Sequence, residues 1–486
     1  MKSIVPRLPE RPFCYQLRPL PHHTRFVIHF FEQLVISLWN RLQGRSRRRG
    51  GKEYSGLTTL GLRVLEEQLT KQLVGLSHTR RTMHQALLGK TGTGKSSLLK
   101  HQCLQDIEAL RGFLYLDLHG DATPFILRAI AALEWKLQED LSDRLIIISP
   151  ADAEMSVGIN PLGGGNPDFV SIAEIAELLK MRWGLDRFGA RTDELLRNTL
   201  YVLAANGFTL LEISPFLTHP GFRAQCLQHV PDGEVRQYFE LRYGAVSEPM
   251  RATMREPILN KISAFTADPR FRHIVGQSNS TFSLQEAMDN GYWIIVNLDK
   301  GKLGAHALTL GGLLFTMVKN AIFTREKRGL FTLYCDELQN LIANASDVET
   351  ILSEARKFGV SVVSANQFLD QYPAPMRAAI LSIGTHCFFQ LSSADATTVA
   401  QMLDGGKSLA ERLKNLPQRH FILKSGADHW TEACVPTVAD SKSSYTDLLN
   451  RSRALRARPR VEIEREIAQR HVALNKKNDG VLHGWD

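Results

Sequence analysis

The 486-residue chain has few features of a secreted or membrane-spanning protein. Its six cysteines are scattered, with no Cys-x-x-Cys pair and no histidine at metal-ligand spacing, which argues against a disulfide framework and a zinc site and agrees with a reducing cytosol. The longest apolar stretch near the start, residues 26–39, contains polar side chains and is shorter than the ~20 apolar residues of a spanning helix. We therefore expect an amphipathic or interfacial helix there, and no signal peptide.

The chain also lacks a charge imbalance beyond its first 52 residues. Residues 1–52 hold 11 Lys/Arg against 2 Asp/Glu, a surplus of 9 that equals the net charge of the whole chain. A basic segment of this kind neutralises the phosphates of a nucleic acid or the headgroups of an anionic membrane leaflet, or it is a solvated linker. Composition does not choose among these roles.

The remainder has the composition of a folded enzyme and shows no internal repeat. Its 43% hydrophobic and 22% charged content exclude a disordered chain and a polytopic membrane protein. Apolar strands alternate with helical segments over residues 85–149 and 292–391, which predicts an α/β fold with a mainly parallel sheet. Between Pro167 and Phe271 the periodicity is helical, with few β-branched runs, and predicts an inserted all-helical lobe.

A glycine-rich segment follows the first of these predicted strands. Residues 89–96 match the pattern G-x-x-x-x-G-K-[ST], between a predicted strand at 85–88 and a predicted helix at 97–110. In this pattern backbone N–H groups and the helix N-terminus bind phosphate, Lys95 reaches the β- and γ-phosphates, and the Ser96 hydroxyl binds Mg²⁺. The segment predicts a site for ATP and Mg²⁺. The residues expected to contact the nucleotide are Gly89, Lys90, Thr91, Gly92, Thr93, Gly94, Lys95, Ser96 and Ser97.

Two adjacent acids end another apolar segment, residues 330–335. With a nucleotide loop upstream, Asp336 is placed to bind Mg²⁺ and Glu337 to polarise the attacking water. The alternative is a pair of acids that caps a buried strand. Asp117, near the end of a predicted strand at 112–118, is a third acid for which a catalytic and a structural role have equal weight.

Seven motifs in order resemble the FtsK/HerA superfamily of DNA-pumping ATPases. The resemblance is greatest to the branch that contains the TraG/TraD conjugative coupling proteins and their HerA-like relatives, and it extends from about Ala86 to about Asp404. The motifs lie at residues 89–96, 116–121 (LDLHGD), 158–162 (GINPL), 276–284, 295–301 (IVNLDKG), 335–339 (CDELQ) and 351–367 (ILSEARKFG through ANQ).

The resemblance implies a homohexameric ring that uses ATP and Mg²⁺ to move double-stranded DNA, with a secretion-system, relaxase or nuclease partner. It assigns Arg356 as the arginine that reaches the γ-phosphate of the neighbouring subunit, and Gln367 as a sensor of that phosphate. The alternative for Arg356 is a solvated residue on a charged helix. Arg191 is a second candidate for a subunit contact.

The sequence departs from the coupling proteins at its N-terminus, where those proteins have transmembrane helices. This departure weakens the secretion assignment but not the motor assignment. Three functions stay open: an ATPase of conjugative DNA transfer or type IV secretion, a soluble HerA-like helicase or translocase in DNA repair or phage defence, and a nucleotide-gated receptor that recruits protein cargo. We expect a cytoplasmic protein, peripheral to the inner membrane if the basic arm binds lipid.

These expectations divide the chain into five parts, with the P-loop ATPase core in two pieces. The first core piece is expected to open with a helix at 57–80, and the C-terminal part to be a peripheral helix or a mobile tail. The parts are a basic arm with a short amphipathic helix (1–55), the first core piece (56–165), the all-α lobe (166–272), the second core piece (273–440) and a charged tail (441–486).

Overall fold

The computed structural model describes residues 56–163, 168–231, 233–342 and 345–479, so the predicted N-terminal arm lies outside the described residues. Residues 57–486 form one compact unit by themselves. The described residues form an 11-stranded sheet with the order β2-β1-β12-β11-β10-β3-β9-β8-β4-β7-β5. The strands from β10 to β5 are parallel, and those from β2 to β10 are joined antiparallel. The predicted α/β class with a mainly parallel sheet is therefore confirmed.

The parallel strands are short and almost entirely buried, because helices cover both of their faces. Each overlaps a strand predicted from the sequence. Their bounds are β3 (Gln85–Leu88), β4 (Phe113–Asp117), β5 (Leu145–Ile148), β7 (Trp293–Asn297), β8 (Phe331–Asp336), β9 (Val360–Asn366) and β10 (Thr385–Phe388).

The antiparallel strands correct one prediction. Residues 57–80 do not form a helix; β1 (Leu57–Leu65) and β2 (Gln68–Ser77) form a hairpin, and only α2 (His78–Arg81) is helical. Glu66 and Glu67 turn the chain with φ of 48° and 63°, the left-handed conformation of tight hairpin turns. The hairpin joins the sheet because β1 pairs with β12 (Thr431–Cys434), which follows β11 (His420–Ser425). These long-range hydrogen bonds override the helical propensity of its Leu, Glu and Lys residues.

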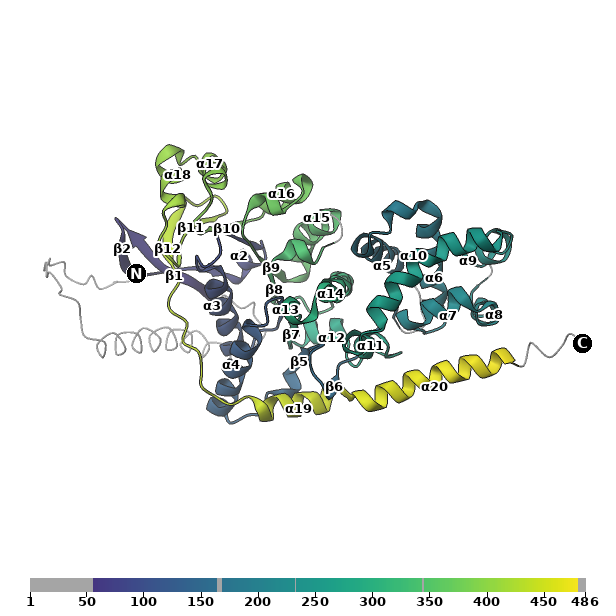
Figure 1. Cartoon of the computed structure of the whole chain (residues 1–486). Helices are drawn as coiled ribbons and strands as arrows, with labels where there is room; N and C mark the ends of the chain where they lie inside the picture. The colour runs from purple at the N-terminus through teal and green to yellow at the C-terminus, as the bar shows by residue number, and fades with distance from the viewer. Residues whose placement is uncertain (1–55, 164–167, 232, 343–344, 480–486) are drawn as a thin grey trace, which may run out of the picture. The chain divides into compact units, whose positions relative to one another are not determined.

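Helices cover the two faces of the sheet (Figure 1). The side chains of β4 alternate, so that Tyr115 packs with α3 (Lys95–Glu108) and α4 (Ala122–Leu137), while Leu116 belongs to the core on the other face, with α14 (Ala305–Phe323). The remaining elements around the sheet are β6 (Met155–Ser156), α12 (Leu284–Asp289), α13 (Lys300–Leu303), α15 (Ala345–Glu354), α16 (Ala374–Leu381), α17 (Ser393–Met402), α18 (Gly406–Lys414), α19 (Thr446–Arg456), β13 (Arg458–Pro459) and α20 (Arg460–Asp479).

All the elements described between β6 and β7 are helical, as predicted, and most of them form a lobe. Its apolar side chains, such as Leu203, belong to the same core cluster as Leu116 of β4, so the lobe is packed onto the sheet through a continuous core. The helices of the lobe are α5 (Phe169–Trp183), α6 (Ala190–Ala205), α7 (Ile213–Thr218), α8 (Pro220–Gln228), α9 (Glu234–Gln237), α10 (Glu248–Thr266) and α11 (Pro269–Val275), with short 3-10 and π segments between them.

Helix α14 is the only helix of the described residues with the length and apolar composition of a membrane span. In this structure 67% of the qualifying stretch is buried inside the protein. Two adjacent glycines allow this close packing: a Cβ atom on Gly311 would approach the side chains of Leu341 and Leu298, and one on Gly312 would meet Leu178 of α5. Helix α14 therefore behaves as a core helix.

The C-terminal part consists mainly of α19 and α20, joined through β13, and these helices contact the rest of the fold (Figure 1). Ile463 on α20 packs against Leu211, and the Arg470 Nε donates a hydrogen bond to the buried Glu212 carboxylate at 2.8 Å. Of the two expectations for this part, the peripheral helix describes it; residues 480–486 lie outside the described residues.

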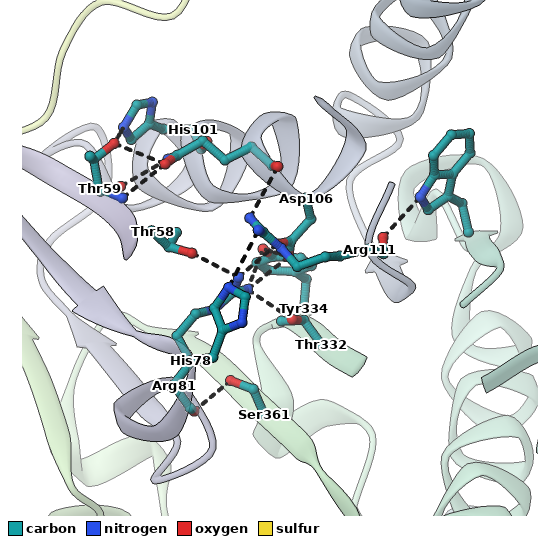
Figure 2. Close-up of polar contacts among 12 residues, drawn as sticks. Thr58, Thr59, His78, Arg81, His101, Asp106, Arg111, Thr332, Tyr334 and Ser361 are labelled. Carbon is teal, nitrogen blue, oxygen red and sulfur yellow. Dashed lines mark hydrogen bonds and ion pairs between the residues drawn. The ribbon is translucent and has the colours of Figure 1, made fainter. Parts of the chain in front are cut away.

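A buried ion pair joins α2, α3 and the interior strand β8 (Figure 2). The Arg81 guanidinium donates hydrogen bonds of 2.6 and 2.7 Å to the two carboxylate oxygens of Asp106 on α3, and one of 2.8 Å to Thr332 on β8. Tyr334 on β8 also donates to Asp106, at 2.6 Å. Although burial alone would raise it, Arg81 and Arg111 hold the pKa of Asp106 well below its usual range. The cluster locks α2, α3 and β8 together.

We predict that Arg81→Met lowers the free energy of unfolding by about 3–5 kcal/mol, because the fully buried Asp106 carboxylate loses its two-pronged partner and keeps only Arg111 as a cation. The matched control is Arg80→Met, which removes an exposed pair with Asp428 and should leave the denaturant midpoint nearly unchanged. Urea unfolding followed by circular dichroism measures both variants. Equal shifts of the two midpoints would contradict the importance of the buried pair.

Candidate nucleotide-binding site

The glycine-rich segment forms a loop between β3 and α3. Gly92 and Gly94 have φ of 77° and 120°, a region that glycine occupies without strain. A Cβ atom on Gly94 would approach the Arg419 Cα to 2.8 Å, so a larger residue does not fit there. Among the described residues no side chain caps the start of α3, which leaves its first-turn N–H groups free to bind an anion.

The side chain of Lys95 lies within this loop. Its Nζ donates hydrogen bonds to the carbonyl oxygens of Gly89 and Lys90, at 2.5 and 2.9 Å. Burial lowers the pKa of Lys95, and the negative charges of Asp336 and Glu337 oppose that shift. The ammonium group is therefore held between the loop and the two acids, where a bound triphosphate would meet it.

The remaining residues predicted to bind nucleotide and metal lie around Lys95. The Ser96 side chain is exposed in the first turn of α3, and Asp336 ends β8 at the same edge of the sheet. Lys90, Thr91, Thr93 and Ser97 belong to the same loop and first turn.

The loop that precedes β11 forms hydrogen bonds with the glycine-rich segment. The Arg419 N–H donates a hydrogen bond to the Thr93 carbonyl oxygen at 2.7 Å, and the Gln418 side chain donates to the Gly92 carbonyl oxygen at 3.0 Å. Sequence reasoning missed both residues. They lie more than 300 positions downstream of the loop, and no motif marks them.

The two acids at the end of β8 are Asp336, the last residue of the strand, and Glu337, whose backbone is left-handed. Glu337 adopts φ 58°, ψ 52°, a left-handed conformation that costs a residue with a side chain about 1–3 kcal/mol and that collects at functional sites. Its N–H donates to the Ala365 carbonyl oxygen at 2.9 Å, which holds the turn against β9. Burial raises the pKa of Asp336 to about 6, assisted by the charge of Glu337 and opposed by His119 and Lys95.

Three side chains from other segments surround the Glu337 carboxylate. Lys300 Nζ donates to Oε2 at 2.5 Å, Asn340 Nδ2 donates to the same oxygen at 2.8 Å, and His119 Nε2 lies 3.7 Å from Oε1. Sequence reasoning singled out none of these three residues. Lys300 and His119 lie within motifs of the family resemblance, at 295–301 and 116–121, so the signal was present without a role attached to it.

Asp117 has a structural role in this geometry. One carboxylate oxygen accepts a hydrogen bond from the Gly120 N–H at 2.8 Å, and the other accepts from the Thr123 N–H and hydroxyl, both at 2.7 Å. The carboxylate shapes the loop between β4 and α4. Of the two roles given equal weight for this residue, the arrangement favours the structural one.

Gln367 follows β9 directly and lies beside the glycine-rich loop. The carbonyl oxygen of the preceding Asn366 accepts a hydrogen bond from the Gly89 N–H at 3.1 Å, and the Gln367 N–H donates to the Gln371 side chain at 2.9 Å. The Asn366 side chain is occupied internally, since it donates to Gln339 and accepts from Tyr372. The tip of β9 is thus linked both to the loop and to the turn after Glu337.

Arg356 lies at the amino-terminal ends of the parallel strands, whereas Lys95 lies at their carboxyl ends. It is exposed in the turn that precedes β9. The pKa of His84, just before β3, is lowered to about 4 mainly by burial, and the positive charge of Arg356 adds to this shift. The seven residues of β9 separate this end from the loop by roughly 20 Å. The structure therefore does not bring Arg356 to the nucleotide site of its own chain.

Arg191 is exposed at the start of α6 in the helical lobe. Its guanidinium donates a hydrogen bond to the sulfur of Met250 at 3.7 Å. Its assignment to a subunit contact stays a prediction.

The residues around Lys95 fit ATP and Mg²⁺. The loop offers glycines at positive φ, a buried ammonium group and uncapped helix N–H groups for phosphates. The described residues contain no cluster of three or more His, Cys, Asp or Glu for a metal. Ser96 and Asp336 instead offer two oxygen ligands, which suits Mg²⁺ because it retains waters and binds phosphate oxygens as well.

The sheet order, the glycine-rich loop and the acids that end β8 define a P-loop nucleoside triphosphatase fold of the RecA type. Among solved structures, the chain is similar to the plasmid coupling protein TrwB in complex with ADP and Mg²⁺, with a TM-score of 0.55 and 17% identity over 81% of this chain and 98% of that chain. The unbound bacterial conjugative coupling protein TrwBdeltaN70 gives a TM-score of 0.55 and 17% identity over 82% and 99%.

The chain is also similar to VirB4 of Thermoanaerobacter pseudethanolicus, with a TM-score of 0.50 and 14% identity over 81% of this chain and 100% of that chain. These likenesses show a common fold, and they confirm at the level of the fold the resemblance inferred from the seven motifs. No protein-family model matches the sequence, and no curated protein matches it significantly.

The raised pKa of Asp336 predicts that Mg²⁺-dependent nucleotide binding weakens as the pH falls through about 6. A Mg²⁺ ion held by this carboxylate would compete with its proton, so the affinity should be constant well above this pKa and decrease below it. Titration of a fluorescent ATP analogue with Mg²⁺ at a series of pH values measures the effect. Asp336→Asn, which retains only the titration of the nucleotide itself, is the control; identical pH profiles would contradict the prediction.

Proposed function

We propose that this protein is an ATP-hydrolysing DNA translocase that acts as a ring. The observation that carries the proposal is the joint position of Lys95, Asp336 and Glu337 at one edge of the parallel sheet, with Arg356 at the other edge. The fold shared with TrwB, a coupling protein solved in complex with ADP and Mg²⁺, supports it.

The chain's own residues supply most of the chemistry of hydrolysis. The loop N–H groups and Lys95 bind and neutralise the phosphates, and Ser96 and Asp336 hold the ion. Bound Mg²⁺ supplies further neutralisation of charge on the phosphate oxygens. Glu337 orients the attacking water and accepts its proton, and Gln367, beside the loop, senses the γ-phosphate.

The position of Arg356 supports a ring in which each nucleotide lies between two subunits. Since its own site is roughly 20 Å away along β9, the guanidinium serves a neighbour's site, where it stabilises charge on the transferred phosphoryl group. A closed ring of six copies repeats this contact at every interface, and its centre accommodates double-stranded DNA.

Within the ring we propose that residues 56–165 and 273–440 form the motor core and that the helical lobe, residues 166–272, faces the incoming DNA. The cellular task we favour is conjugative DNA transfer or type IV secretion, with a relaxase or secretion-system partner, because TrwB and VirB4 share the fold. The protein acts in the cytoplasm, and its basic arm, residues 1–55, binds either DNA or the inner membrane surface. A HerA-like repair or defence motor with a nuclease partner has the same site.

Duplex DNA should increase the rate of ATP hydrolysis by the wild-type protein. In a motor, DNA binding and turnover are coupled, whereas a nucleotide-gated cargo receptor would be insensitive to DNA. A steady-state ATPase assay with and without DNA, together with the native mass of the assembly, measures both properties. Lys95→Ala should abolish turnover under either condition; wild-type activity in this variant would refute the ATPase assignment itself.

Arg356→Ala should bind ATP normally and lose roughly 10³- to 10⁵-fold in turnover, the contribution of an arginine supplied to a neighbouring phosphoryl-transfer site. Mixing it with Lys95→Ala subunits should restore part of the activity, because some interfaces then combine an intact loop with an intact arginine. ATPase assays on rings verified as mixed by native mass detect the recovery. If mixed rings stay as inactive as either parent, while rings diluted with wild-type subunits regain activity in proportion, the arginine does not act across the interface.

A further inference from the structure

The Glu337 carboxylate is held by one of its two oxygens. Lys300 and Asn340 both donate to Oε2, at 2.5 and 2.8 Å. Within the described part of the chain Oε1 has no hydrogen bond, and His119 lies 3.7 Å from it. A carboxylate bound in this way is fixed in orientation while one oxygen stays available to a water molecule.

Both members of the ion pair stand on fixed backbone. The Lys300 N–H donates to the Leu118 carbonyl oxygen at 3.0 Å, which ties the start of α13 to the end of β4, and the Glu337 N–H is bonded to Ala365 on β9. The Glu337 side chain is only 10% exposed and that of Lys300 36%, so the pair is largely withdrawn from solvent. A partly buried pair between fixed segments orients its members more firmly than a surface pair does.

We propose that Lys300 is a positioning residue for the hydrolytic step, a role that rests on the proposed ATPase function. Lys300 and Asn340 hold Oε2 so that Oε1 receives the proton of the attacking water. The water oxygen then bonds to the γ-phosphorus, and the bond from that phosphorus to the bridging oxygen breaks, with its electron pair leaving on ADP.

The test is the steady-state ATPase of Lys300→Met in the full-length protein. Its kcat should fall roughly 10- to 100-fold, as for other residues that orient a reacting group through a hydrogen bond. The KM for ATP and the affinity for a fluorescent ATP analogue should stay within about twofold of the wild type, because no ground-state contact with nucleotide is removed. Lys300→Arg, which keeps a donor and the charge, should recover part of kcat.

The matched control is Lys302→Met, two residues further along α13. The Lys302 side chain is 75% exposed and pairs with Asp299 at 2.9 Å, so its loss should leave kcat unchanged. Asn340→Ala provides an independent variant and should reduce kcat by less than Lys300→Met, since the charged donor remains. In a Glu337→Gln background, which already lacks the carboxylate, Lys300→Met should cause no further loss.

Several results would overturn this role for Lys300. An unchanged or increased kcat in folded Lys300→Met would show that the pair is dispensable or restrains the base. An additional loss in the Glu337→Gln background, or a parallel loss of nucleotide binding, would place Lys300 on the nucleotide instead. A wild-type protein that hydrolyses no ATP would refute the proposed function, and this role with it; active wild type beside fully active Lys300→Met and Asn340→Ala would refute this role alone.

Discussion

The buried ion pair between Arg81 and Asp106 is the constraint on which the geometry of the candidate site depends. Both charges are fully buried, and Arg81 has its charged partner on α3 and further hydrogen-bond partners on β8, so α2, α3 and β8 must come together for Arg81 to be buried. Asp106 is on the helix that begins at Lys95, and Tyr334, which also bonds to Asp106, is two residues before Asp336. The pair therefore sets the distance between the loop that binds phosphates and the strand that carries the acids.

The parallel half of the fold was predictable because its signal is local. Each buried strand is a short apolar run bounded by helical segments, and the alternation itself implies parallel pairing. The hairpin at 57–77 was not predictable in this way. Its Leu, Glu and Lys residues favour a helix, its turn is formed by Glu66 and Glu67 rather than by asparagine and glycine, and it is stabilised by β12, which comes more than 350 residues later.

The residues of the candidate site likewise divide into those marked by a local sequence pattern and those brought in by long-range contacts. Lys95, Ser96 and Asp336 lie in contiguous patterns whose chemistry can be read from their spacing, and the structure places them together. Lys300 at the start of α13 and Arg419 just before β11 each reach the site through a contact that no spacing rule encodes. Residues that support a site from distant segments are visible only when the tertiary structure is known.

The backbone of Glu337 has a consequence for how this chain can change over time. A left-handed conformation is relaxed in glycine and tolerable in asparagine, so either substitution at 337 would relieve backbone strain while removing the carboxylate and its bonds to Lys300 and Asn340. Selection for thermal robustness and selection for turnover therefore act in opposite directions at this one position. A lineage that kept the fold but lost the need for hydrolysis should drift toward glycine there before its core changes.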